Sequence, residues 1–418
     1  MKTNLLIINK LFSCLLSLYL KAGLLILIAL MPLHVLLVTK IGIPGIWKEC
    51  VIASILLAWI VKALLQKKIV LVKTKISIPI VFFIMYCSAL LVNDIDGFNA
   101  NIFGLRNLVQ YIIIFFLVTI IVKKNDIKKY IFLVLFVGLW ISCVNTISFL
   151  LEPGRIALIL YKPYHSSTKF LAYDFLGANN YPFYLNALIC ISLGIFLVHS
   201  SKKIKFLLLC NIFILLISSF LTYSRGSLFS LIAVVLFCGL KYRKRIFVYF
   251  ILLCLIGIFL LPHTMYERFL TIGSYKEAIS TRAAVISENL TLFQANPFFG
   301  IGLGKVGSVG GENTIMPHNY YMYLLLQTGI LGLVIYLWIF VIFFKTSFNL
   351  ALRLEDRYFK GLMVGVTLYY IMIGVASLTM ATGEAFLSAF LFWFLGGVVM
   401  VLDNDIRKGK FRGRVRIC

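Results

Sequence analysis

Long apolar stretches recur along nearly the whole chain, and they constrain its fold more than any other feature. A helix that crosses a membrane needs about 20 mostly apolar residues. Because lipid cannot hydrogen-bond to the backbone, each such stretch is expected to be a helix. The sequence therefore predicts an all-α, polytopic membrane protein, one integral membrane domain over residues 1–418, with about 12 spans. They lie at 22–39, 49–65, 76–93, 107–122, 130–150, 181–199, 206–223, 227–241, 246–262, 319–344, 361–380 and 386–402.

The composition excludes several other classes of protein. Apolar residues make up 61% of the chain and charged residues only 13%, too few for the surface of an ordinary soluble domain. The net charge of +25 is typical of nucleic-acid binding, but the lysines and arginines form short clusters between apolar spans, where they determine topology instead. The nine cysteines are scattered singly, without the spacing of a metal site. We therefore expect no nucleic acid, no metal and no cofactor.

The distribution of basic residues predicts an orientation. If the N-terminus is cytoplasmic, most lysines and arginines outside the spans fall on the cytoplasmic side, as the positive-inside tendency requires. Both termini are then cytoplasmic. Two long loops, 151–180 and 263–318, face the outer side, periplasmic or extracellular.

Three residues on that outer side are candidates for a functional site. Arg225 lies in the short turn "TYSRGS", Arg282 lies in the second long loop, and His318 stands at the edge of the span that follows. A guanidinium presents a planar fork that suits phosphate oxygens. Structural roles are the alternatives: Arg225 capping a helix or binding lipid headgroups, Arg282 lying on a solvated helix face, and His318 fixing its loop by hydrogen bonds.

The residues around His318 suggest how it is held. Asn319 is a good N-cap for the helix expected to begin there, which would keep His318 just outside the helix at the membrane edge. A neutral imidazole in that place can take a proton from a hydroxyl nucleophile. Lys305, on the same side, can add a positive field for a diphosphate.

The second long loop contains two further patterns. "YKEAISTRAAVISENLTLFQANP" predicts an amphipathic helix at the membrane surface that ends at Pro297. "FFGIGLGKVGSVGG" follows, and its glycines permit turns and close backbone approach. The segment lacks the spacing of a nucleotide-binding P-loop.

These motifs carry a family resemblance. "LTYSRGSLFSLIAV" (221–234), "TRAAVISENLTLFQANPFFGIGLGKVG" (281–307) and "PHNYYMYLLLQTGILGLVIYL" (317–337) resemble, in order and spacing, the bacterial O-antigen ligase and O-antigen polymerase family. An SRG turn between two spans, an NPxxGxGxG loop and an HN before a span with GIxG are the shared features. The corresponding family core region covers residues 206–345.

The resemblance implies a fold, a reaction and a location. It implies a metal-independent, inverting glycosyltransferase with a GT-C-like helical fold in the bacterial inner membrane, its active site facing the periplasm. Such enzymes transfer a glycan from undecaprenyl diphosphate to an acceptor sugar hydroxyl. By the same resemblance Arg225 and Arg282 hold the diphosphate, and His318 activates or positions the acceptor.

Several functions remain open at this point. A ligase delivers the glycan to lipid A-core, whereas a polymerase of O-antigen, exopolysaccharide or capsule joins lipid-linked repeats. The single, compact outer loop before His318 slightly favours the ligase. A polysaccharide transporter or flippase is a remoter alternative, because transporters usually carry charged or broken helices at the midplane. A scaffolding protein would leave the three motifs unexplained.

Overall fold

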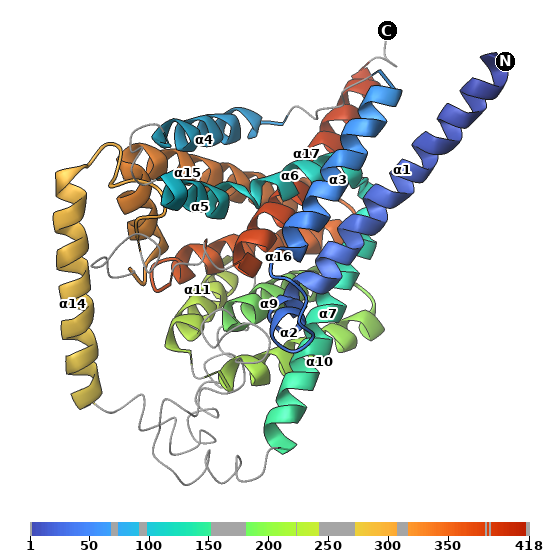
Figure 1. The fold of residues 1–418 in the computed structure, drawn as a ribbon. Coiled ribbons are helices and arrows are strands. Elements are labelled where there is room, and N and C mark those ends of the chain that lie inside the picture. Colours follow the sequence, from blue (N-terminus) through green and yellow to red (C-terminus); the bar gives the residue numbers. More distant parts are fainter. Residues whose placement is uncertain are drawn as a thin grey trace.

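The computed structural model describes residues 2–67, 74–91, 98–151, 181–222, 224–241, 272–306, 317–380, 383 and 386–414. Within these ranges all regular structure is helical (Figure 1). The elements are α1 (Lys2–Leu30), η1 (Met31–Leu33), α2 (His34–Thr39), α3 (Trp47–Leu65), α4 (Ser77–Leu90), α5 (Phe98–Val109), α6 (Ile112–Ile121), α7 (Lys124–Leu151), α9 (Tyr181–Val198), α10 (Lys202–Phe220), α11 (Arg225–Lys241), α14 (Ile272–Ala295), α15 (Tyr320–Arg353), α16 (Arg357–Ala376) and α17 (Phe386–Arg414).

The predicted polytopic, all-α architecture is confirmed. Eight continuous helical stretches in the described residues are long and apolar enough to cross a membrane. Three further predicted spans form helices that are shorter or more charged, α3, α4 and α11. The remaining predicted span, 246–262, lies outside the described residues.

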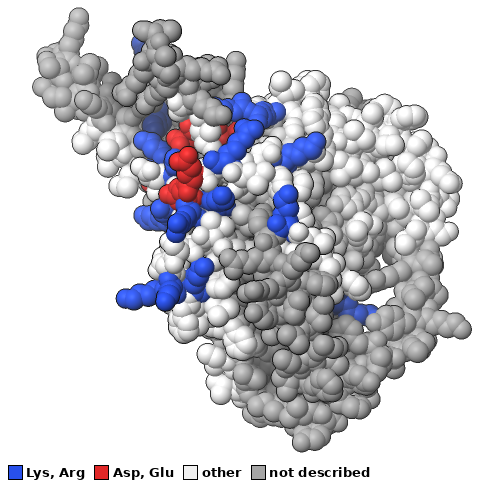
Figure 2. Space-filling view, turned by 180° about the vertical axis from the view of Figure 1, so that it is seen from behind, with Lys and Arg blue, Asp and Glu red and all other residues white. Residues whose placement is uncertain are grey.

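Charged side chains gather at one end of the bundle, here named the basic face. Ion pairs join helices there: Lys21 to Asp126 at 2.9 Å and Lys124 to Asp405 at 2.8 Å. These residues come from segments that the positive-inside count assigned to one side. The N-terminal end of α1 and the C-terminal end of α17 also point to this end of the molecule (Figure 1), and Figure 2 shows the clustered charges beside a largely uncharged surface. That this face is cytoplasmic stays a prediction.

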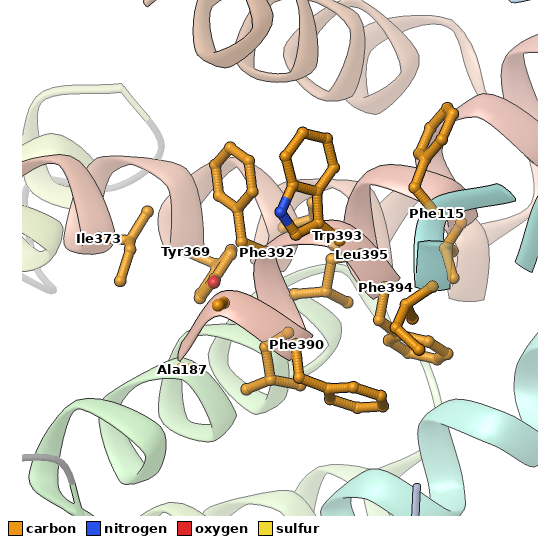
Figure 3. Close-up of a cluster of buried hydrophobic side chains, with 14 of the residues drawn as sticks. Phe115, Ala187, Tyr369, Ile373, Phe390, Phe392, Trp393, Phe394 and Leu395 are labelled. Carbon is orange, nitrogen blue, oxygen red and sulfur yellow. The ribbon is translucent and has the colours of Figure 1, made fainter. Parts of the chain in front are cut away.

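The core is built around α9, α16 and α17, which are buried along most of their length. A helix that is apolar all round suits such a central position. Aromatic rings of α17 pack against α6 and α15, with the Trp393 ring centroid 6.4 Å from Phe115 and 5.9 Å from Phe343 (Figure 3). These contacts fix the central helices relative to one another.

Glycines bring α9 and α16 into close contact. A Cβ on Gly194 would meet the backbone of Gly365 and Gly361, and a Cβ on Gly365 would lie 2.8 Å from the Ile191 Cα. Small residues allow backbones to approach in lipid, where packing replaces the hydrophobic driving force. This close crossing fixes α9 and α16 relative to each other, and both helices support the candidate functional site.

Candidate functional site

His318 stands directly before α15, as the sequence predicted. The Asn319 side chain caps the helix, accepting hydrogen bonds from the Tyr321 N–H at 2.9 Å and the Met322 N–H at 3.2 Å. The backbone N–H of Tyr320 donates to the Ser377 carbonyl at 2.8 Å, which ties the start of α15 to the end of α16. The His318 side chain is exposed, so it is accessible from outside the bundle.

Arg225 lies at the same end of the bundle. It is the first residue of α11 and is half-buried. A Cβ on the adjacent Gly226 would lie 2.7 Å from the Thr379 Oγ1, and Thr379 follows Ser377 by two residues. The segment 377–379 therefore contacts both the SRG turn and the start of α15. We name this end of the molecule the motif face.

A polar network inside the bundle holds the SRG turn. The fully buried Asn186 amide of α9 donates to the Ser227 carbonyl at 2.9 Å and accepts from the Ser219 hydroxyl at 3.1 Å. It also lies 3.3 Å from the Ser230 hydroxyl. Unpaired polar groups are costly in lipid, so a different packing of these helices would break the network at a cost. The network therefore favours a single arrangement of the helices. It fixes the position at which α11, and hence Arg225, begins.

The glycine motif forms a loop that docks onto a break in α15. Gly329 has φ +62° and ψ −172°, a conformation almost restricted to glycine. The Ile301 N–H donates to the Leu326 carbonyl at 2.7 Å, and the Ile330 N–H donates to the Pro297 carbonyl at 2.9 Å. The loop thus binds backbone groups on either side of the break.

Helices from the N-terminal half of the chain hold the other side of this loop. The Tyr86 hydroxyl of α4 donates to the Thr328 carbonyl at 2.7 Å. The Gly304 N–H donates to the Gln327 side-chain oxygen at 3.1 Å, and a Cβ on Gly104 of α5 would overlap the Gly304 backbone. The segment 297–306 is therefore a rigid part of the motif face, here named the glycine loop.

Two predicted site residues are placed less completely. Arg282 lies on α14, but its side chain is outside the described part of the chain. The α14 helix itself is confirmed; it ends two residues before Pro297 and contacts α15. Its position at a membrane surface stays a prediction. Lys305 is half-buried in the glycine loop. The outer loop residues 152–180 and 307–316 lie outside the described residues.

A small cavity lies beneath the motif face. It is lined by Tyr320 and Tyr336 of α15, Asn107 of α5, and Ser388 and Trp393 of α17, among others. Its volume of about 20 Å³ has room for about one water molecule. A sugar cannot enter it in this conformation, so a glycan would contact residues at its rim.

Sequence reasoning did not identify the residues that hold this site in position. It treated 319–344 as an unbroken span, but α15 is broken at Gly329, and the only signal was the GIxG pattern. It gave no role to Asn186 or to segment 377–379, because an isolated Asn or Ser in an apolar run does not indicate its partner. In the described residues, no three His, Cys, Asp or Glu side chains come together as metal ligands would.

Comparison with known proteins places these features in a family. Residues 210–337 match the family described as O-antigen ligase, which confirms the predicted resemblance. No curated protein matches the chain. The matched segment includes the SRG turn, α14, the glycine loop and the His318 start of α15, and it supports a membrane glycan transferase of the ligase or polymerase type. The chain is therefore a multi-pass membrane protein in which residues 210–337 are similar to the O-antigen ligase family.

Proposed function

We propose that this protein transfers a glycan from undecaprenyl diphosphate to an acceptor sugar hydroxyl on the motif face, which is the periplasmic side of the bacterial inner membrane. The observation that carries the proposal is that segment 377–379 contacts both Gly226, next to Arg225, and Tyr320, two residues after His318. Residues 210–337, which include Arg225 and His318, match the O-antigen ligase family. A cation and a proton acceptor on one face are what the transfer of a diphosphate-linked sugar needs.

The proposed step is a single inverting displacement. The acceptor hydroxyl oxygen forms a bond to the anomeric carbon of the donor sugar, and the bond from that carbon to the diphosphate oxygen breaks. Undecaprenyl diphosphate leaves with the bonding electrons, while the hydroxyl proton passes to the His318 imidazole. Arg225 and Arg282 hold the diphosphate and stabilise its charge, with Lys305 adding positive field, and no metal takes part.

His318 is suitably placed for this role. Its exposed ring follows the buried Pro317 and precedes the capped Asn319, so the backbone on both sides of it is anchored. Segment 377–379 binds the first turn of α15, and the glycine loop binds the same helix at its break, at Leu326 and Ile330. Positioning is worth several kcal/mol in a bimolecular transfer. An anchored histidine at an accessible edge can meet an acceptor from outside while the donor stays in the membrane.

We favour a ligase that delivers the glycan to lipid A-core. The alternative is a polymerase that joins lipid-linked repeats of O-antigen, exopolysaccharide or capsule, since both kinds of enzyme use the same chemistry. Deletion of the gene distinguishes them. A ligase deletion leaves the lipopolysaccharide core bare while long chains accumulate on the lipid carrier, whereas a polymerase deletion leaves a single repeat on the core.

The role of His318 is tested by complementing that deletion with His318→Ala. We expect transfer to be abolished while membrane abundance stays at the wild-type level. His199→Ala is the matched control, because His199 is a half-buried histidine between α9 and α10 whose Nδ1 accepts a local hydrogen bond from the Ser201 N–H. Near-normal transfer by His318→Ala would exclude the proposed base. An unchanged lipopolysaccharide ladder in the deletion itself would exclude the function.

A further inference from the structure

A second group of polar and aromatic side chains lies at the motif face, away from His318. It is formed by the start of α2, the first turn of α3 and the first turn of α17. The Trp47 indole N–H donates to the His34 Nδ1 at 2.9 Å, and the His34 ring meets Phe386 edge-on, with centroids 5.0 Å apart. The Lys48 ammonium lies 5.1 Å from the centre of the Phe386 ring. We name these residues, with Glu49, Arg106 and Tyr111, the second cluster.

Several polar atoms of the second cluster have unused hydrogen-bonding capacity. Among the residues that the structure describes, the buried Glu49 Oε2 has no hydrogen-bond partner, and neither does the hydroxyl of Tyr111, whose side chain is 2% exposed. Glu49 and Arg106 are close enough to act electrostatically on Tyr111. No ion pair joins Lys48 to a carboxylate in the described part of the chain. Unsatisfied buried polar groups cost free energy, and a bound polar group such as water or a sugar hydroxyl would lower that cost.

The mixed chemistry of the second cluster selects among ligands. Lys48 and Arg106 would attract a phosphate, but the carboxylate of Glu49 beside them would repel it. A sugar suits both charges, because its hydroxyl groups donate to a carboxylate and accept from an ammonium. The half-exposed Trp47 and the Phe386 ring offer apolar surface for the C–H face of a pyranose.

The second cluster lies near the proposed reaction site. Asn107, which follows Arg106, and Ser388, two residues after Phe386, line the small cavity whose other wall includes Tyr320. Tyr320 lies two residues after His318. The second cluster and the start of α15 therefore lie near the same cavity at the motif face.

We propose that Lys48 and Glu49, with the rings of Trp47 and Phe386, form a glycan-binding subsite that holds a sugar residue remote from the reacting hydroxyl. The proposal rests on the proposed function for the identity of the glycan, which belongs either to the acceptor or to the donor. Its role is to position the chain, since the second cluster has no contact with the reacting atoms.

The test is a binding measurement on the full-length protein in lipid nanodiscs. Two fluorescently labelled probes are used: the core oligosaccharide released by mild acid from the host's lipopolysaccharide, and the delipidated repeat oligosaccharide. We expect Glu49→Gln and Lys48→Met to weaken binding of one probe at least about tenfold, because each removes a charge-assisted hydrogen bond. The weakened probe identifies the acceptor or the donor as the source.

Matched controls separate this effect from a general charge effect. Lys62→Met changes a lysine at the other end of α3, and Glu355→Gln changes an exposed glutamate between α15 and α16; both should bind like the wild type. His318→Ala should also bind the probe, so that transfer fails while the subsite remains. Wild-type affinity in both Lys48→Met and Glu49→Gln, or no binding of either probe to the wild type, would overturn the subsite. Retained transfer by His318→Ala would refute only the proposed base.

Discussion

Replacing Gly329 by Ala tests whether the docked glycine loop is required for the site. Gly329 has a backbone conformation almost restricted to glycine, and a Cβ there would overlap the Phe298 carbonyl oxygen. The overlap is with backbone, which cannot turn aside as a flexible side chain can. Either α15 regains a regular helical conformation at this position, or the glycine loop moves away.

The magnitude follows from the contacts at the break. The backbone conformation costs alanine about 1–3 kcal/mol, and relieving the overlap with backbone costs about 1–3 kcal/mol more. Moving the loop breaks the Ile301 to Leu326 and Ile330 to Pro297 hydrogen bonds, worth about 0.5–1.5 kcal/mol each. The backbone strain and the overlap together destabilise the docked state by about 2–6 kcal/mol, a factor of about 30 or more in the docking equilibrium.

The assay is transfer activity in the complemented deletion strain, with membrane abundance and the thermal unfolding midpoint of purified protein measured alongside. We expect Gly329→Ala to lose most of its transfer activity and to unfold at a lower temperature. Gly45→Ala is the control, because nothing lies within 4 Å of a Cβ at that position. Wild-type activity and stability in Gly329→Ala would refute the reasoning, since the site would then not depend on the break in α15.

Two other substitutions probe the supports of the site. Asn186→Leu removes the side chain that bonds Ser227 and Ser219, at about 0.6–1.7 kcal/mol per hydrogen bond in lipid, so it should lower the unfolding temperature and reduce transfer. Asn211→Leu removes the hydrogen bond to Ser192 and should have the smaller effect; the reverse order would contradict the role of the network. Gly365→Leu places a side chain against the Ile191 backbone and should sharply reduce the amount of folded protein in the membrane. Gly409→Leu is the control, because a Cβ at that position has no atom within 4 Å. Equal abundance of the two variants would show that the α9–α16 crossing is not close-packed.

The helices could be predicted from the sequence because each is encoded locally. An apolar run of membrane length has one favourable backbone structure in lipid, and Asn319 signals the start of α15 through bonds within its own turn. The ion pair between Lys21 and Asp126 likewise joins segments that charge counting had grouped. Local composition was therefore sufficient for the spans and their grouping, but not for their packing.

The site could be predicted only in part, because its geometry depends on partners distant in the sequence. Arg225 and His318 were identified by chemistry and resemblance, yet what joins them is segment 377–379, beyond the family region. Asn186 is as polar as other isolated residues in apolar runs, and only its four neighbouring polar groups distinguish it. The unused hydrogen-bonding groups of Glu49 and Tyr111 become apparent only when the burial of each atom is known.

The break in α15 explains why the glycine motif and the histidine motif occur together in one domain. Without the break, His318 would precede one continuous helix of 34 residues, and its position would depend on the position of that whole helix in the membrane. With it, residues 320–328 are held by the glycine loop on one side and by Ser377 on the other, while residues 330–353 pack in the bundle. The position of His318 is thus set by backbone hydrogen bonds at the motif face. A substitution in the glycine loop should accordingly affect transfer as strongly as one beside His318, although the loop supplies no reacting group.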